Sequence, residues 1–101
     1  MPRILIVDDE PTILNLLNKI LIGQGYDATP ASNGEKALQL LQTEKFDLMI
    51  SDINMTPING MELLRKASES WPDMGVIMLT AYGTVATAVE AMKEGAFDYI
   101  T

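Results

Sequence analysis

Short apolar runs alternate along the chain with longer segments in which apolar residues recur every three or four positions. A short apolar run bounded by polar or turn-forming residues is typical of a strand buried on both faces of a parallel sheet. A short segment at 26–30, with alternating residues and turn-prone ends, predicts a more peripheral strand. Together these segments predict strands at residues 4–7, 26–30, 48–50, 76–79 and 97–100.

The first two intervals between these strands predict helices. In the first interval, apolar residues at i, i+3, i+4, i+7 and i+8 form a stripe that ends at Gly23. The residues of this stripe are Ile13, Leu16, Leu17, Ile20 and Leu21. The second helix opens at Ser32-Asn33-Gly34-Glu35, which resembles a capping box. Its apolar side carries Ala37, Leu38, Leu40 and Leu41.

The last two intervals also predict helices. Asn59-Gly60 can cap the third helix, which ends at Trp71-Pro72 because a residue before proline disfavours helical geometry. Its apolar residues are Leu63, Leu64 and Ala67. The fourth helix opens at Thr84 and closes at Gly95. Its apolar residues in register are Val85, Ala88, Val89 and Met92.

Strands and helices in this alternation predict one α/β domain over residues 1–101, a size near the small end of the usual range. The expected fold is a flavodoxin-like, doubly wound parallel sheet with helices on both faces. Right-handed crossovers leave few topologies, and the strand order 2-1-3-4-5 places the first and third strands side by side.

Acidic residues stand where two of the buried strands end. Asp8 and Asp9 follow the run at 4–7, and Asp52 follows the run at 48–50. We expect the three carboxylates to converge, because neighbouring parallel strands end at the same edge of a sheet. Two carboxylates about 4 Å apart repel by roughly 4 kcal/mol at an effective dielectric constant near 20, so we expect a divalent cation, and oxygen ligands suit Mg²⁺. Two plainer interpretations stay open: Asp52 caps a turn, and the acids form a solvated rim.

Thr80 ends the fourth strand and would flank Asp52 from the other side. A carboxylate nucleophile, a divalent cation and a hydroxyl donor are the minimal parts for forming an aspartyl phosphate. The product adds a charge of about −1.5 to −2 at the strand end, and Thr80 can answer by moving toward it. This set of groups therefore favours a switch over a turnover catalyst. A threonine that merely finishes a strand is the alternative.

Composition removes several classes of site. The chain has 14 acidic and 7 basic residues and a net charge of −7, so direct nucleic-acid binding by this domain is not expected. It has no cysteine and no histidine, which excludes thiolate or imidazole metal ligands and histidine general bases. No signal peptide or membrane-spanning apolar run is present, so we expect a cytoplasmic protein with no membrane contact.

The segments around these strand ends resemble the receiver domain of two-component response regulators, over essentially the whole chain. They are Ile4-Leu5-Ile6-Val7-Asp8-Asp9-Glu10-Pro11, Asp52-Ile53-Asn54-Met55 with Gly60, Leu79-Thr80-Ala81-Tyr82-Gly83, and Gly95-Ala96-Phe97-Asp98-Tyr99-Ile100. The last two segments, together with Ala88, Ala91 and Met92, are most similar to transcription activators of the nitrogen-regulation (NtrC-like) type.

The resemblance implies that Asp52 accepts a phosphoryl group from the phosphohistidine of a sensor histidine kinase. The implied Mg²⁺ ligands are Asp8, Asp9, Asp52 and the backbone carbonyl of Asn54. Thr80 would be the switch hydroxyl and Tyr99 an aromatic that turns inward on activation, although an aromatic half-packed at a sheet edge is an open alternative for Tyr99. Phosphorylation would switch the face formed by the fourth helix and fifth strand, and so control an output domain. Slow self-dephosphorylation is the only turnover expected.

The sequence departs from the family pattern in two places. Thr56 stands where the family usually has proline, and Pro57 follows it. The chain ends at Thr101, where the family places its phosphate-binding lysine, and it lacks the fifth helix, so a truncated receiver domain is expected. That helix would contribute about 5 to 10 kcal/mol of apolar burial. We therefore expect an exposed apolar face over the first helix and last strand, which the chain covers by self-association or exchange of elements.

Two other functions stay open. A receiver-like docking module would act only through contact with a partner, and Asp52→Asn would leave that contact unchanged. A Mg²⁺-dependent phosphohydrolase with an aspartate nucleophile usually carries Asp-x-Asp, whereas Asn54 stands two residues after Asp52. Multiple turnover on phosphomonoesters would identify this second alternative.

Overall fold

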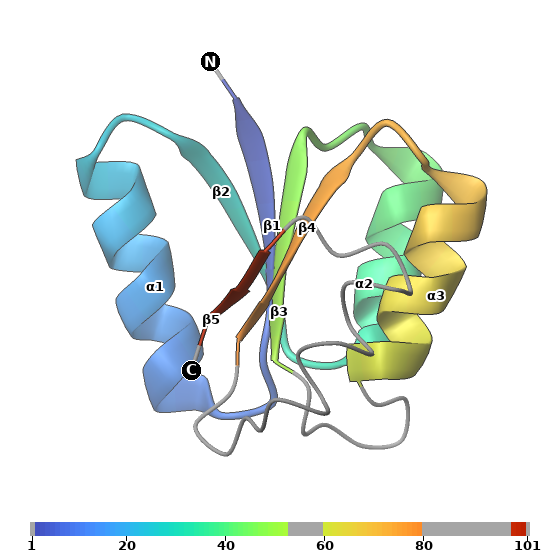
Figure 1. Cartoon of the computed structure of the whole chain (residues 1–101). Helices are drawn as coiled ribbons and strands as arrows, with labels where there is room; N and C mark the ends of the chain where they lie inside the picture. The colour runs from blue at the N-terminus through green and yellow to red at the C-terminus, as the bar shows by residue number, and fades with distance from the viewer. Residues whose placement is uncertain (1, 53–59, 80–97, 101) are drawn as a thin grey trace.

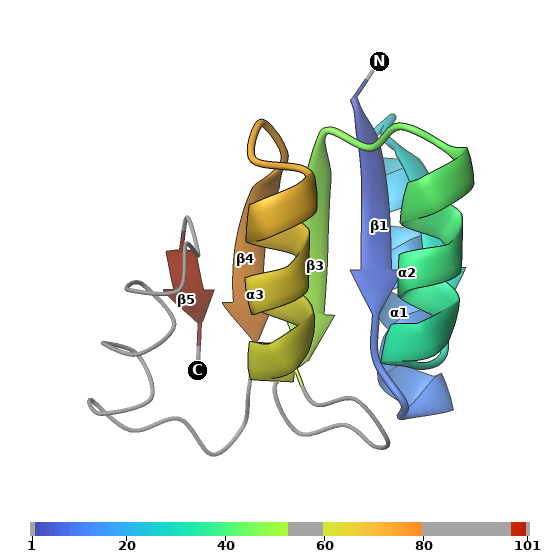
Figure 2. The same cartoon turned by 90° about the vertical axis from the view of Figure 1, so that its right-hand side faces the viewer.

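The computed structural model describes residues 2–52, 60–79 and 98–100. Parallel strands form one sheet in the order β2-β1-β3-β4-β5, with α1 on one face and α2 and α3 on the other (Figure 1, Figure 2). The strands are β1 (Arg3–Val7), β2 (Asp27–Ala31), β3 (Leu48–Asp52), β4 (Gly75–Leu79) and β5 (Asp98–Ile100). The helices are α1 (Pro11–Gly23), α2 (Gly34–Thr43) and α3 (Gly60–Ser70). The predicted doubly wound fold and strand order are confirmed, and the helix predicted over 84–95 lies outside the described residues.

The composition of β1 and β2 explains why β1 lies inside the sheet and β2 at its edge. β1 pairs with β2 on one side and with β3 on the other, and its residues 4–7 are all buried. β2 contains Pro30 and is more exposed. Proline has no N–H to donate, which an edge strand tolerates. The peripheral position predicted for this strand is therefore confirmed.

The two faces of the sheet carry apolar cores of unequal size. The core on the α2 and α3 face includes Leu5, Val7, Met49, Leu63, Leu64 and Met78, all of which are almost fully buried. On the α1 face, Ile4, Ile6 and Leu14 are buried, and Leu17, Leu21, Leu48 and Ile50 are only half-buried against them. Among the residues that the structure describes, those on the α1 face of the sheet are thus the less completely buried.

The orientation of α1 differs from the predicted apolar stripe. Leu14, which the stripe did not include, is buried, whereas Ile13, Leu16 and Ile20 of the stripe are 43%, 56% and 50% exposed. Apolar residues occur on most sides of this helix, so their spacing does not single out the face that meets the sheet. The exposed side chains agree with the apolar surface predicted over the first helix.

Local capping sets where helices begin and end. α2 is capped by Asn33, whose Oδ1 accepts a hydrogen bond from the N–H of Lys36 at 2.8 Å. The predicted capping box began one residue earlier, at Ser32, and this assignment was wrong because the amide side chain of Asn33 takes the capping position. α3 ends at Ser70, before Trp71-Pro72, as predicted.

The difference between the two sides of α1 can be measured. We expect Leu14→Ala to lower the free energy of unfolding by about 2 to 4 kcal/mol, because it leaves a cavity against β1. Leu16→Ala removes the same atoms from an exposed position and should change the free energy of unfolding by about 0.5 kcal/mol or less. Urea denaturation at low protein concentration, followed by circular dichroism, distinguishes the two. Equal losses would contradict the orientation of α1.

Candidate metal centre at the carboxyl edge of the sheet

The predicted acidic side chains lie together where β1 and β3 end. These strands are neighbours, with Val7 paired to Ser51. Carboxylate oxygens of Asp8, Asp9 and Asp52 all lie within 4.8 Å of one another. We call these three residues the acidic cluster. Their predicted convergence is confirmed, and it follows from the strand order and register.

The three carboxylates differ in burial. Asp8 is only 3% exposed, Asp52 is half-buried and Asp9 is exposed. A buried carboxylate needs hydrogen-bond partners, and Asp8 Oδ1 accepts one from the N–H of Glu10 at 2.9 Å. The N–H of Asp8 donates to the carbonyl of Ala31 at 3.2 Å, which ties this position to β2. Asp8 is therefore fixed by the backbone on both sides.

Burial raises the pKa of the Asp8 carboxyl above its ordinary value. The hydrogen bond from the Glu10 N–H lowers this pKa, and the negative charges of Asp9 and Glu10 raise it further. The folded chain thus holds Asp8 in surroundings that disfavour its charge. A cation at the acidic cluster would remove this penalty.

The donor set of the acidic cluster consists of oxygen atoms alone. Three carboxylates bring a formal charge of −3 to one point of the sheet edge. Hard oxygen ligands of this kind match Mg²⁺, which binds proteins through a few carboxylates and keeps water or phosphate oxygens in its other positions. The residues present fit a Mg²⁺ ion.

Backbone contacts also hold the end of β3. Asp52 pairs in register with Leu79 of β4, and the buried Ser51 hydroxyl donates to the carbonyl of Asp52 at 3.0 Å. Ser51 and the Glu10 N–H had no predicted role. The turn at Asp8 has a recognisable signal, since an aspartate often accepts a hydrogen bond from the N–H two residues later. No comparable signal marks Ser51, which lies inside an apolar strand.

Three other predicted site residues are not tested by this geometry. Asn54 and Thr80 lie outside the described residues. Tyr99 lies on β5, where its backbone pairs with Met78 of β4, and its inward turn stays a prediction. Thr56 and Pro57 also lie outside the described part of the chain.

Within 2–52, 60–79 and 98–100, no helix combines the length and the apolar character that crossing a bilayer requires.

Comparison with known proteins gives consistent matches. Residues 4–101 match the family described as "Response regulator receiver domain". The transcriptional regulatory protein GlrR of Escherichia coli (strain K12) is 41% identical over 99 residues, which is 98% of this chain. The response regulator protein PilR of Pseudomonas aeruginosa is 40% identical over 98% of this chain. The chain spans 22% of the length of each of these relatives.

Solved structures share the fold. The response regulator protein TrrA of Thermotoga maritima, solved in complex with Mg²⁺ and BeF, is 38% identical with a TM-score of 0.91, and the match covers 100% of this chain and 86% of that one. A response regulator receiver domain protein from Clostridium thermocellum is 36% identical with a TM-score of 0.92, covering 99% of this chain and 81% of the other.

The charge penalty at Asp8 predicts a stabilising substitution. Asp8→Asn keeps an oxygen acceptor for the Glu10 N–H and removes one negative charge. We expect the free energy of unfolding at pH 7, without divalent cations, to rise by about 1 to 2 kcal/mol. Asp73→Asn, which changes an exposed acid outside the acidic cluster, should leave it unchanged.

The same effect has a defined pH dependence. Because the pKa of Asp8 is raised on folding, proton binding stabilises the fold fully below the ordinary carboxyl pKa of 3.8, and that stability is lost as pH rises through the higher folded-state pKa. The advantage of Asp8→Asn should therefore vanish at low pH, where wild-type Asp8 is also neutral. Urea denaturation at several pH values measures this, and a lower stability of the variant at pH 7 would contradict it.

Proposed function

The chain belongs to the response regulator receiver domain family, and we propose from this premise that Asp52 is its phosphoacceptor. Receiver domains are phosphoacceptor switches rather than turnover enzymes, so a phosphohydrolase is not the function we infer. One observation carries the proposal: a carboxylate oxygen of Asp52 lies within 4.8 Å of those of Asp8 and Asp9. In such an arrangement one carboxylate can react while the other two hold a shared cation that offsets the negative charge.

The different surroundings of the three acids support different roles. Asp8 is buried and its Oδ1 is held by the Glu10 N–H, so it suits a fixed metal ligand. Asp9 is exposed and lies beyond the end of β1, where it can complete the same ligand set. Asp52 is the last residue of β3 and is half-buried, which supports a carboxylate that an incoming phosphoryl group can reach. We assign nucleophilic attack to Asp52 on these grounds.

The transfer step is a displacement at phosphorus. An oxygen of the Asp52 carboxylate forms an O–P bond as the N–P bond of a kinase phosphohistidine breaks, and the leaving imidazole takes a proton. The ligands we propose for Mg²⁺ are Asp8, Asp9, Asp52 and the backbone carbonyl of Asn54. When bound, Mg²⁺ would screen the charge of the carboxylates and the phosphoryl oxygens. The Mg²⁺ and BeF in the TrrA structure support this cofactor.

The sheet offers a route from Asp52 to an output. The phosphoryl group of the product carries a charge of about −1.5 to −2, in place of the single charge of the carboxylate, beside the end of β4, where Thr80 follows Leu79 and can donate its hydroxyl. Leu79 pairs with Ile100, and Met78 pairs with Tyr99, so a shift at the end of β4 reaches β5 directly. We propose that Thr80 and Tyr99 move together and that the face near the fourth helix and fifth strand controls a transcription-activating output domain.

The partners we propose follow from the same chemistry. The phosphodonor is a sensor histidine kinase, and the location is the cytoplasm. Hydrolysis of the aspartyl phosphate by water gives slow self-dephosphorylation. The net charge of −7 disfavours direct contact of this domain with nucleic acid, which is also negatively charged. A second copy of the chain is a further partner, because Ile13, Leu16 and Ile20 expose apolar side chains along α1.

Phosphorylation tests the central assignment. With Mg²⁺ and a small phosphodonor such as acetyl phosphate, we expect intact mass spectrometry to show the addition of one phosphoryl group. Asp52→Asn should abolish it, because an amide oxygen is a poor nucleophile, and chelation of divalent cations should reduce it at least about tenfold. Asp73→Asn is the matched control and should react like the wild type. Full phosphorylation of Asp52→Asn would overturn the assignment.

Self-association tests the role of α1. We expect the wild type to show a concentration-dependent mass above that of a monomer in sedimentation equilibrium at tens of micromolar. Leu16→Gln combined with Ile20→Gln should restore the monomer mass, because it removes the apolar contact surface. Lys19→Gln, on the same helix, should leave association unchanged. A wild-type chain that stays monomeric at these concentrations would exclude a second copy as a partner.

A further inference from the structure

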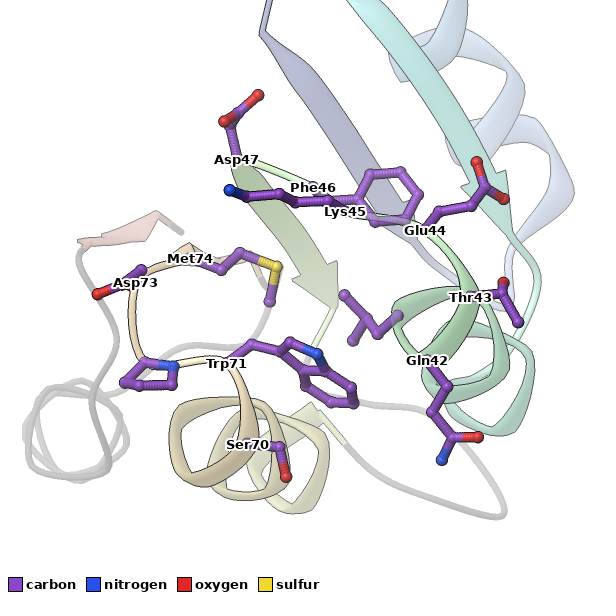
Figure 3. A pocket seen from close by; sticks show the side chains of 12 residues that line it. Gln42, Thr43, Glu44, Lys45, Phe46, Asp47, Ser70, Trp71, Asp73 and Met74 are labelled. Atoms are coloured by element: carbon purple, nitrogen blue, oxygen red, sulfur yellow. The ribbon is translucent and has the colours of Figure 1, made fainter.

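A cavity of about 550 Å³ opens at the amino edge of the sheet, opposite the acidic cluster. Its lining comes from two stretches far apart in the sequence, 41–47 at the end of α2 and 70–74 between α3 and β4 (Figure 3). We call it the amino-edge cavity. Its volume lies within the range of about 300 to 1,000 Å³ that is typical of small-molecule sites.

The inner lining of the amino-edge cavity is apolar and partly aromatic. Phe46 and Met74 are buried, and Trp71 is half-buried. Figure 3 shows the Met74 thioether directed toward the Trp71 indole. Aromatic faces and a polarisable sulfur favour contact with another aromatic ring over an aliphatic group of the same size.

The wall that carries Phe46 is fixed by Arg3. The guanidinium carbon of Arg3 lies 4.8 Å from the centroid of the Phe46 ring, and Nη1 donates to the Lys45 carbonyl at 3.0 Å. Two further hydrogen bonds join Arg3 and Asp47: the Arg3 N–H donates to Asp47 Oδ2 at 2.8 Å, and the Asp47 N–H donates to the Arg3 carbonyl at 2.9 Å. A cavity with such a wall is formed before a ligand arrives, which lowers the entropy lost on binding.

The opposite wall is held by backbone hydrogen bonds. The N–H of Met74 donates to the Trp71 carbonyl at 3.1 Å, and the N–H of Gly75 donates to the Asp47 carbonyl at 3.1 Å. The second bond joins the 41–47 stretch to the first residue of β4, directly after the 70–74 stretch. These hydrogen bonds therefore fix the distance between the two walls of the cavity.

The charged residues of the lining are three acids, Glu44, Asp47 and Asp73, and one base, Lys45, and all four are exposed. Glu44 forms an ion pair with Arg3, and the Asp47 carboxylate accepts the Arg3 N–H. In Figure 3 the side chains of Glu44, Asp47 and Asp73 point away from the Trp71 indole. A charged ligand would lose its hydration without meeting an opposite charge inside, so the cavity selects an uncharged molecule.

One polar group in the lining lacks a protein partner. In the described part of the chain, the indole N–H of Trp71 has no protein acceptor and is open to solvent, whereas its backbone N–H donates to the Ala67 carbonyl. Indole offers a donor only, and it usually finds an acceptor when buried. A ligand that fills the cavity would bury this N–H further and would have to supply that acceptor.

We propose that the amino-edge cavity binds a small, uncharged aromatic molecule that carries a carbonyl or similar hydrogen-bond acceptor. The ring packs against Trp71, Met74 and Phe46, and the acceptor takes the hydrogen bond of the Trp71 indole. The site stands at the other end of β3 from Asp52, so it does not depend on the phosphoacceptor function. Binding stabilises the folded domain in proportion to ligand occupancy.

The single tryptophan makes the site easy to observe. Trp71 is the only tryptophan of the chain, so one indole N–H signal in a proton–nitrogen NMR spectrum reports on the cavity. We expect acetophenone to shift this signal saturably, with a dissociation constant of about 0.1 to 1 mM. Ethylbenzene, a similar ring without the carbonyl, should bind about three- to tenfold more weakly because it leaves the indole N–H unpaired.

Variants and matched compounds separate the contributions. Trp71→Phe removes the donor and should abolish the preference for acetophenone, with binding read from the backbone amide of Met74. Tyr26→Phe, at an exposed aromatic residue elsewhere, should preserve the preference. Cyclohexyl methyl ketone keeps the acceptor without the aromatic ring and should bind more weakly than acetophenone. If Trp71→Phe does not fold, the binding of the three compounds to the wild type still tests the proposal.

Several results would overturn the proposal. Equal binding of the cyclohexyl ketone would remove aromatic selectivity, and tighter binding of benzylamine or benzoate would remove the preference for uncharged ligands. Shifts centred on Leu16 and Ile20 of α1, without a shift at Trp71, would show general adsorption to exposed apolar surface. A peptide with a phenylalanine side chain that binds where acetophenone does not would identify a protein partner instead of a small molecule.

Discussion

Mutual repulsion among three carboxylates is the constraint around which this domain is built. Two parallel strands that lie side by side bring Asp8, Asp9 and Asp52 to one edge, with oxygens within 4.8 Å of each other. The buried apolar residues of β1 and the backbone bonds to Asp8 offset this repulsion. A fold that tolerates such crowding is biased toward any event that neutralises it, so cation binding is coupled to the shape of the sheet edge.

The strand β3 connects two chemically different ends of the molecule. Its carboxyl end presents an acidic, partly exposed site, whereas the chain just before its amino end lines an apolar cavity beside Phe46. Between them Met49 and Ser51 are completely buried, so the strand is held firmly by its neighbours. Chemistry at one end therefore need not disturb the other, and each site keeps its own selectivity.

Features set by local periodicity or by strand ends were predictable from the sequence. The strand order and the convergence of Asp8, Asp9 and Asp52 follow from short apolar runs that stop at acids. The buried face of α1 was not predictable, because Leu14 is one of many apolar residues spread over most sides of that helix. The amino-edge cavity was also missed, since the meeting of Trp71 with Phe46 depends on packing between distant segments. Sequence spacing carries little information about such contacts.

The central place of β1 has a consequence for how the chain is made. β1 is synthesised first, yet one of its two neighbours, β3, and the Asp47 contact of Arg3 come 44 residues later. On the ribosome, an apolar strand must therefore wait with an open side until roughly half of the chain has emerged. Long-range pairing of this kind slows folding, because the entropy of closing a long loop is lost before the paired strands gain their contacts.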